Sequence, residues 1–144
     1  MSGSERHRAA SAAATEELAA ELARELEPGA VVLVSGELGA GKTTFVRGAA
    51  RALGVSEPVT SPTFTIGQRY RGDVPVSHLD LYRLAAGLGA EEPGLLDDYL
   101  TPEAVAFVEW PEVAGDELAE VTVRVTITHR GGDGREVSIE WVRR

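Results

Sequence analysis

The chain of 144 residues contains no cysteine, which excludes both disulfides and thiolate metal sites. It also lacks any run of the roughly 18 apolar residues that a membrane-spanning helix needs. Its first residues, MSGSERHR, lack the apolar core of a signal peptide. We therefore expect a cytoplasmic protein with no membrane partner.

Basic residues are scarce as well. Lys and Arg number 14 against 23 Asp and Glu, which gives a net charge of −9. A surface with this charge repels a phosphate backbone, so strong direct binding of nucleic acid is not expected. Only one of the 14 basic residues is a lysine, Lys42, and its surroundings give the reason for it.

Lys42 lies in GELGAGKTT (residues 36–44), which fits the phosphate-loop pattern G-x-x-x-x-G-K-[ST]. Glycines allow the tight turn that aims backbone N–H groups at phosphate oxygens, and the following helix adds a partial positive charge. In this exposed loop a compact ammonium reaches phosphates that the planar fork of arginine fits poorly. Against the alternative of a plain glycine-rich turn, we expect an ATP-binding loop made of Gly36, Glu37, Leu38, Gly39, Ala40, Gly41, Lys42, Thr43 and Thr44.

The rest of the chain predicts a single α/β domain. Residues 1–12 read as a disordered tail and residues 13–144 as the domain, whose first helix would be capped by Thr15. Residues 30–35 and 104–110 are apolar runs typical of buried parallel strands, and residues 42–54 read as a helix. GGDG between residues 120–130 and 135–142 predicts a hairpin. We expect a mixed sheet with parallel core strands, an antiparallel C-terminal hairpin and flanking helices.

Two carboxylates are candidates for binding Mg²⁺ and orienting water. Asp80 and Glu109 each end a predicted strand, where ligands collect in open α/β sheets. Thr43 would add a hydroxyl to the metal. The alternative for each acid is a solvated carboxylate at a strand end, and the phosphate loop favours the functional interpretation.

Four further residues have two interpretations each. Thr63, in SPTFT, either senses phosphate as switch loops do or simply enters a strand. His78 is either a metal ligand or, as we expect, a packed or hydrogen-bonded histidine. Trp110 belongs either to the core or beside the nucleotide, and Arg135 is either functional or a turn residue.

The residues alone leave several activities open. A small-molecule kinase would need an arginine-bearing lid, and no insertion of lid length exists. A GTPase would need a second lysine for the N-K-x-D loop that recognises guanine, which excludes this class. A nucleotide-dependent binding module with negligible turnover remains an alternative.

Four blocks in order resemble the TsaE family, the P-loop ATPases of tRNA threonylcarbamoyladenosine biosynthesis. They are GELGAGKTTFVRGAARALGV, VTSPTFTI, HLDLYRL and VEWPE, and the resemblance runs from about Thr15 to the C-terminal hairpin. It implies a single P-loop NTPase-like domain that binds ATP and Mg²⁺.

The resemblance also implies roles. Glu109 would be the acidic Mg²⁺ ligand beside Thr43. Asp80 would be the Walker-B-type acid that is needed, with Lys42, for hydrolysis. Thr63 would be the switch threonine. Thr15 would lie near the adenine, and Arg135 matches a hairpin arginine of the nucleotide site. The implied partners are the proteins TsaD and TsaB, on which a slow, partner-dependent ATPase would act without catalysing the transfer itself.

Overall fold

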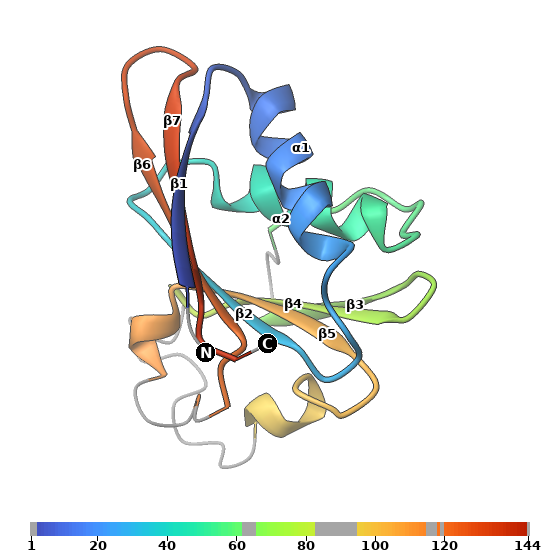
Figure 1. The fold of residues 1–144 in the computed structure, drawn as a ribbon. Helices are drawn as coiled ribbons and strands as arrows, with labels where there is room; N and C mark the ends of the chain where they lie inside the picture. Colours follow the sequence, from blue (N-terminus) through green and yellow to red (C-terminus); the bar gives the residue numbers. More distant parts are fainter. Residues whose placement is uncertain (1–2, 62–65, 83–94, 115–117, 119, 144) are drawn as a thin grey trace.

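The fold is one strongly twisted, seven-stranded mixed sheet with two helices on one side (Figure 1). The computed structural model describes residues 3–61, 66–82, 95–114, 118 and 120–143. The strand order is β1-β7-β6-β2-β5-β4-β3. The strands are β1 Gly3–Ala9, β2 Val31–Ser35, β3 Gly67–Arg71, β4 Pro75–Asp80, β5 Val105–Glu109, β6 Val123–His129 and β7 Arg135–Trp141. The helices are α1 Ala12–Ala23 and α2 Lys42–Ala52, with 3-10 segments η1 Leu95–Asp98 and η2 Pro111–Val113.

The expected parallel core and antiparallel edges are confirmed. β2 pairs in parallel with β5 and β6, and β5 pairs in parallel with β4. β3 and β7 join antiparallel, β7 through the predicted hairpin. The carboxyl ends of β2, β5 and β4 therefore meet at one edge of the sheet.

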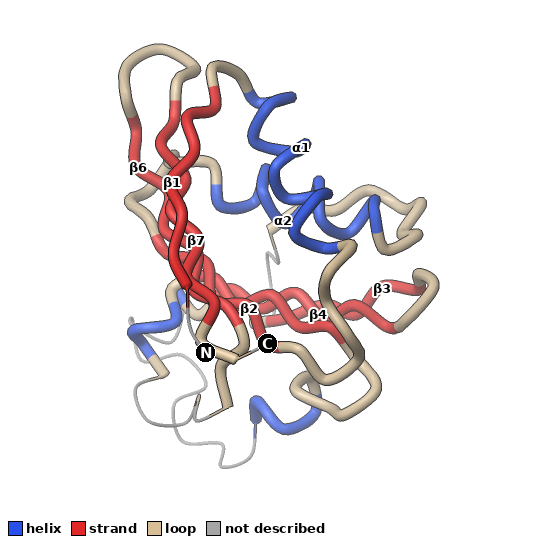
Figure 2. Tube along the Cα trace, viewed as in Figure 1, coloured by secondary structure: helices blue, strands red, loops and turns tan. Residues whose placement is uncertain are grey.

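Both faces of the central strands are buried, which explains their continuous apolar sequences. On one face, Val34 and Phe107 pack with Phe45 of α2 in the main core. On the other, Leu33 and Val108 join a second cluster with Leu96 of η1. Figure 2 shows α1 and α2 on one side of the sheet and the 3-10 segments on the other.

The first helix begins earlier than its sequence predicts. Ser11 caps it, accepting a hydrogen bond from the N–H of Ala14 at 3.1 Å, so Thr15 is not the N-cap. Thr15 instead lies within α1 and is 1% exposed. Serine is the better N-cap of the two residue types, and Ser11 lies one turn before Thr15.

The expectation of a disordered tail over residues 1–12 is wrong for residues 3–9. Gly3–Ala9 form β1, which pairs antiparallel with β7 along its whole length, from Gly3 opposite Trp141 to Ala9 opposite Arg135. Only Ala9 of this strand is buried. This exposed edge strand is held mainly by its pairing with β7, and backbone pairing does not require apolar side chains. Its polar sequence therefore resembles that of a disordered segment.

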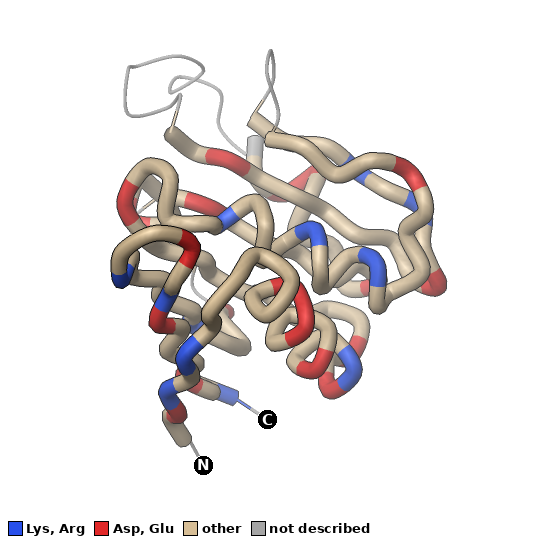
Figure 3. Tube along the Cα trace, turned by 90° about the horizontal axis from the view of Figure 1, so that it is seen from above, with Lys and Arg blue, Asp and Glu red and all other residues tan. Residues whose placement is uncertain are grey.

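No helix in the described part of the chain is long and apolar enough to cross a membrane. Seen from above, Lys and Arg positions are scattered among Asp and Glu positions along the trace (Figure 3).

Gly48 permits the close approach of the two helices. A Cβ atom added there would lie 2.4 Å from the carbonyl oxygen of Glu16 and 2.5 Å from its Cα, both backbone atoms of α1. We predict that Gly48→Ala lowers the free energy of unfolding, because overpacking costs about 1–3 kcal/mol and exceeds the gain in helix propensity of roughly 1 kcal/mol. Urea unfolding measures this.

Gly3→Ala is the matched control for Gly48→Ala. No heavy atom lies within 4 Å of a Cβ added at Gly3, so the same substitution meets open space there. If Gly48→Ala were as stable as the Gly3→Ala protein, the close packing of α1 on α2 would not limit stability.

Candidate nucleotide site

The phosphate loop connects β2 to α2, as its motif requires. Gly41, the N-cap of α2, has a φ of 106°, a left-handed conformation that favours glycine. Gly36 must lack a side chain for a different reason, because a Cβ there would lie 2.7 Å from the carbonyl oxygen of Ile127 in β6. These glycines hold the loop against the carboxyl edge of the sheet.

Lys42 is buried, 6% exposed, and not an exposed loop residue as its motif suggested. Its Nζ donates to the carbonyl oxygens of Gly36 at 2.7 Å and Glu37 at 2.8 Å. The ammonium also lies 4.5 Å from the ring centroid of Trp110, a cation–π contact. Burial lowers the pKa of Lys42, and the negative charges of Glu109, Asp80 and Glu112 oppose that shift.

The two candidate carboxylates come together across neighbouring strands. Asp80 ends β4 and Glu109 ends β5, and the parallel register places them opposite one another. Glu109 is 2% exposed. Burial raises the pKa of Asp80, the charge of Glu109 adds to that shift, and hydrogen bonds from the N–H of Tyr82 and from Ser61 oppose it.

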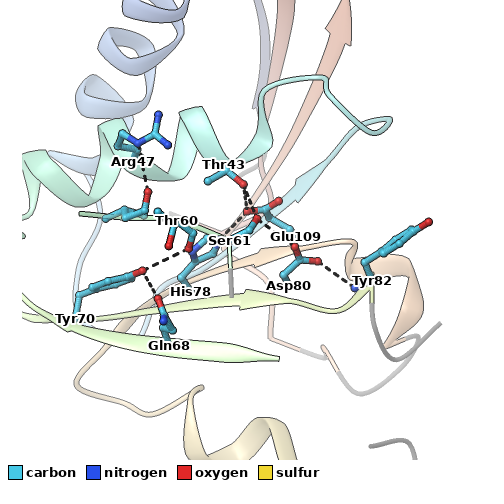
Figure 4. A network of polar contacts seen from close by, with 11 residues as sticks. Thr43, Arg47, Thr60, Ser61, Gln68, Tyr70, His78, Asp80, Tyr82 and Glu109 are labelled. Atoms are coloured by element: carbon cyan, nitrogen blue, oxygen red, sulfur yellow. Dashed lines mark hydrogen bonds and ion pairs between the residues drawn. The ribbon is translucent and has the colours of Figure 1, made fainter. Parts of the chain in front are cut away.

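A chain of hydrogen bonds connects these acids to the loop (Figure 4). Thr43 Oγ1 donates to Glu109 Oε2 at 3.0 Å and lies 2.9 Å from Ser61 Oγ. Ser61 in turn donates to Asp80 Oδ2 at 3.4 Å. His78 Nε2 lies 2.6 Å from Glu109 Oε2, so the expectation of a hydrogen-bonded histidine is confirmed.

Sequence reasoning missed Ser61. It selected Thr63 in the same SPTFT segment, and Thr63 lies outside the described residues. Ser61 carries no motif signal of its own. Its place between Thr43 and Asp80 follows from how the segment after Val59 passes α2, where Arg47 Nε donates to the carbonyl oxygen of Val59 at 3.3 Å.

Trp110 and Arg135 both lie at the loop. Trp110 has a φ of 59°, and among the described residues it is the only non-glycine with a positive φ. This conformation costs roughly 1–2 kcal/mol and sets the indole beside Lys42. Arg135 of β7 donates from Nε to the carbonyl oxygen of Ala40 at 2.6 Å and from Nη2 to that of Gly39 at 3.3 Å. It is therefore more than a turn residue.

These groups surround one cavity of about 350 Å³, within the usual range for small-ligand sites. The lining residues are Leu38, Gly39, Gly41, Lys42, Thr43, Thr44, Ser61, Asp80, Glu109, Trp110 and Arg135. Gly36, Glu37 and Ala40 contribute carbonyl groups to Lys42 and Arg135 instead. Thr15 does not line the cavity, and its buried Oγ1 has no hydrogen-bond partner among the described residues.

A larger cavity, about 480 Å³, lies at the opposite end of the sheet, beside Glu27, Ala30 and Trp141. It contains none of the predicted site residues. The smaller cavity is the candidate site because a phosphate loop and two strand-end carboxylates converge there, which size alone does not show.

Comparison with known proteins agrees with this geometry. The family model described as "Threonylcarbamoyl adenosine biosynthesis protein TsaE" matches residues 9–137. The chain is 40% identical over 113 residues to the tRNA threonylcarbamoyladenosine biosynthesis protein TsaE of Bacillus subtilis, covering 78% of this chain and 70% of that protein. It is 46% identical over 120 residues to the Streptomyces coelicolor TsaE, covering 81% and 80%.

A solved structure is also similar. The crystal structure of YdiB from Bacillus subtilis matches with a TM-score of 0.82 and 34% identity, covering 99% of this chain and 88% of that one. With a family model that spans residues 9–137 and relatives matched over most of their length, the chain belongs to the TsaE family.

Proposed function

We propose that this chain is an ATP-binding and ATP-hydrolysing accessory protein of tRNA N6-threonylcarbamoyladenosine modification. It acts in the cytoplasm on a TsaD–TsaB complex and does not catalyse the transfer itself. One observation carries the ATPase part of the proposal: Lys42 and Thr43 of the phosphate loop line the same cavity as Asp80 and Glu109. The relatives are named as tRNA threonylcarbamoyladenosine biosynthesis proteins, which supports the assignment of the chain to this pathway.

The oxygen donors at the cavity fit Mg²⁺. No group of three or more His, Cys, Asp or Glu side chains in the described ranges forms a metal site complete in itself. Mg²⁺ does not need one, because it takes one or two carboxylates and completes its shell with phosphate oxygens and waters. Glu109, Asp80 and the Thr43 hydroxyl would hold it, and the bound ion would neutralise charge on the phosphates.

Lys42 supplies the main positive charge for phosphate binding. Its ammonium now donates to two loop carbonyls, and phosphate oxygens are stronger acceptors for those hydrogens because they are ionised. The side chain is already desolvated, so little water is displaced when it changes partners. Trp110 over the same ammonium restricts where it can move.

The described part of the site is short of cations for fast phosphoryl transfer. Lys42 and Arg135 are the only basic residues among those that line the cavity. Arg135 also donates to the carbonyl oxygens of Gly132 and Gly134, so all its described bonds go to backbone groups. Transition states of this class usually require further positive charge, often an arginine finger. We therefore infer that a partner supplies it and that the chain alone hydrolyses ATP slowly.

We predict that Lys42→Ala and Lys42→Arg each weaken ATP binding by at least roughly tenfold, since a hydrogen bond to a charged group contributes about 1.5–3 kcal/mol. The fluorescence of Trp110, which contacts Lys42, reports the binding. Arg124→Lys, an arginine–lysine exchange at an exposed position of β6, is the control. Normal ATP affinity in Lys42→Arg would show that the loop does not require a compact charge.

We predict that Glu109→Gln and Asp80→Asn reduce ATP hydrolysis more than ATP binding. The loop and Lys42 carry most of the phosphate contacts, whereas the carboxylates serve the metal and water. Phosphate release and Trp110 fluorescence, measured on the same samples, separate the two effects. Hydrolysis at the wild-type rate in both variants would refute the assignment of the carboxylates.

We predict slow ATPase activity for the chain alone, well below the typical enzyme value of about 10 per second. Adding TsaD and TsaB should raise the rate, and an ATP analogue should tighten the complex, since coupling between two ligands is reciprocal. The measurements are phosphate release and partner affinity with ATP analogue, ADP and no nucleotide. Equal affinities together with an unchanged rate would instead favour an independent enzyme, such as a small-molecule kinase.

A further inference from the structure

His78 is a fully buried histidine in contact with the candidate metal site. It is 0% exposed, lies in β4 two residues before Asp80, and approaches the carboxylate of Glu109 on β5. In the parallel register His78 is opposite Phe107, so its ring reaches diagonally to the residue two positions further along β5. Neither the phosphate loop nor the strand-end acids assign a role to it.

The hydrogen bonds determine which form of the histidine is present. An ionised Glu109 can only accept, so His78 Nε2 must donate the hydrogen of the 2.6 Å contact. Nδ1 is buried and has no hydrogen-bond partner among the described residues. A hydrogen on Nδ1 would be a buried donor without an acceptor, which is costly, so the neutral Nε2–H tautomer fits this site.

Both donors to Glu109 act on the same oxygen. His78 and Thr43 each donate to Oε2, and no described residue donates a hydrogen bond to Oε1. A carboxylate that is 2% exposed needs such donors in place of water. Because Oε2 is held from the sheet and from α2 together, rotation of the carboxylate is restricted and Oε1 is the oxygen left for a cation in the cavity.

We propose that His78 is a positioning residue that orients Glu109 for the divalent cation of the site. The proposal rests on the proposed function, in which Glu109 is a ligand of that cation. His78 itself touches neither cation nor nucleotide in this role. Hydrogen-bond partners of metal-ligating side chains typically contribute 10–100-fold to metal affinity or activity.

Three substitutions distinguish a positioning hydrogen bond from mere packing. The side-chain amide of glutamine extends to about the position of imidazole Nε2, so His78→Gln keeps a donor for Glu109. The amide of asparagine reaches only the position of Nδ1, so His78→Asn keeps polarity without that donor. His78→Leu removes the donor and keeps much of the volume.

The probe is Mn²⁺, a spectroscopic substitute for Mg²⁺, titrated into the full chain with ADP and followed by electron paramagnetic resonance. His78→Leu and His78→Asn should weaken Mn²⁺ binding about 10-fold or more. His78→Gln should restore most of the affinity. ADP binding without metal, followed by Trp110 fluorescence, should match the wild type in all three variants.

Three results would overturn the positioning role. They are unchanged Mn²⁺ affinity in His78→Leu, equal losses in His78→Gln and His78→Asn, or a parallel loss of metal-free ADP binding, which indicates general packing. Thermal unfolding checks that each variant folds. If His78→Leu does not fold, the comparison of His78→Gln with His78→Asn still tests the proposal.

Glu109→Gln, measured in the same way, separates this inference from the proposed function. If Glu109→Gln weakens Mn²⁺ binding and His78→Leu does not, only the role of His78 is wrong. If Glu109→Gln leaves Mn²⁺ binding unchanged, Glu109 is not the ligand, and the metal assignment and the positioning role are refuted together.

Discussion

The parallel pairing of β5 with β2 on one side and β4 on the other is the constraint on which the site depends. It brings the carboxyl ends of three strands to one edge, where β2 leads into the phosphate loop and β4 and β5 end in Asp80 and Glu109. Parallel strands need crossover connections, and α2 provides one that also begins at Lys42. A shift of β4 by one residue would turn Asp80 and His78 to the other face of the sheet.

Buried polar side chains are concentrated at this edge of the sheet, and most of the remaining core is apolar. Lys42, His78 and Glu109 are among the few buried polar side chains, together with Thr15 and Ser77. Each of the three contacts another group of the site or the loop backbone, as buried polar atoms require. The raised pKa of Asp80 and the lowered pKa of Lys42 both have burial as their main cause. The same burial strengthens every electrostatic interaction that a phosphate would make there.

The strands on the other side of β2 also support the loop. β7 places Arg135 against the carbonyl groups of Ala40 and Gly39, and β1 extends the sheet beyond β7. Ile127 of β6 limits the space at Gly36. The phosphate loop is therefore held on one side by the hairpin and on the other by the acids of β4 and β5, which leaves its cavity open between them.

The sequence by itself determined the motif-bearing parts. Sequence patterns predicted the phosphate loop at residues 36–44, the buried strands, the hairpin around GGDG and the two strand-end acids. Each of these features depends on neighbouring residues or on a short repeat of apolar positions. The resemblance to the TsaE family was likewise evident from sequence segments that include the phosphate loop and the two acids.

Only the tertiary structure decided the remainder. The edge strand β1 has no local signal, since its backbone bonds to β7 from the other end of the chain. Ser61 joins Thr43 to Asp80, and His78 reaches Glu109 31 residues away, through contacts that no local pattern encodes. The burial of Lys42 likewise follows from packing against Trp110 and the loop carbonyls. Side chains that meet across strands depend on register, and register is a property of the assembled sheet.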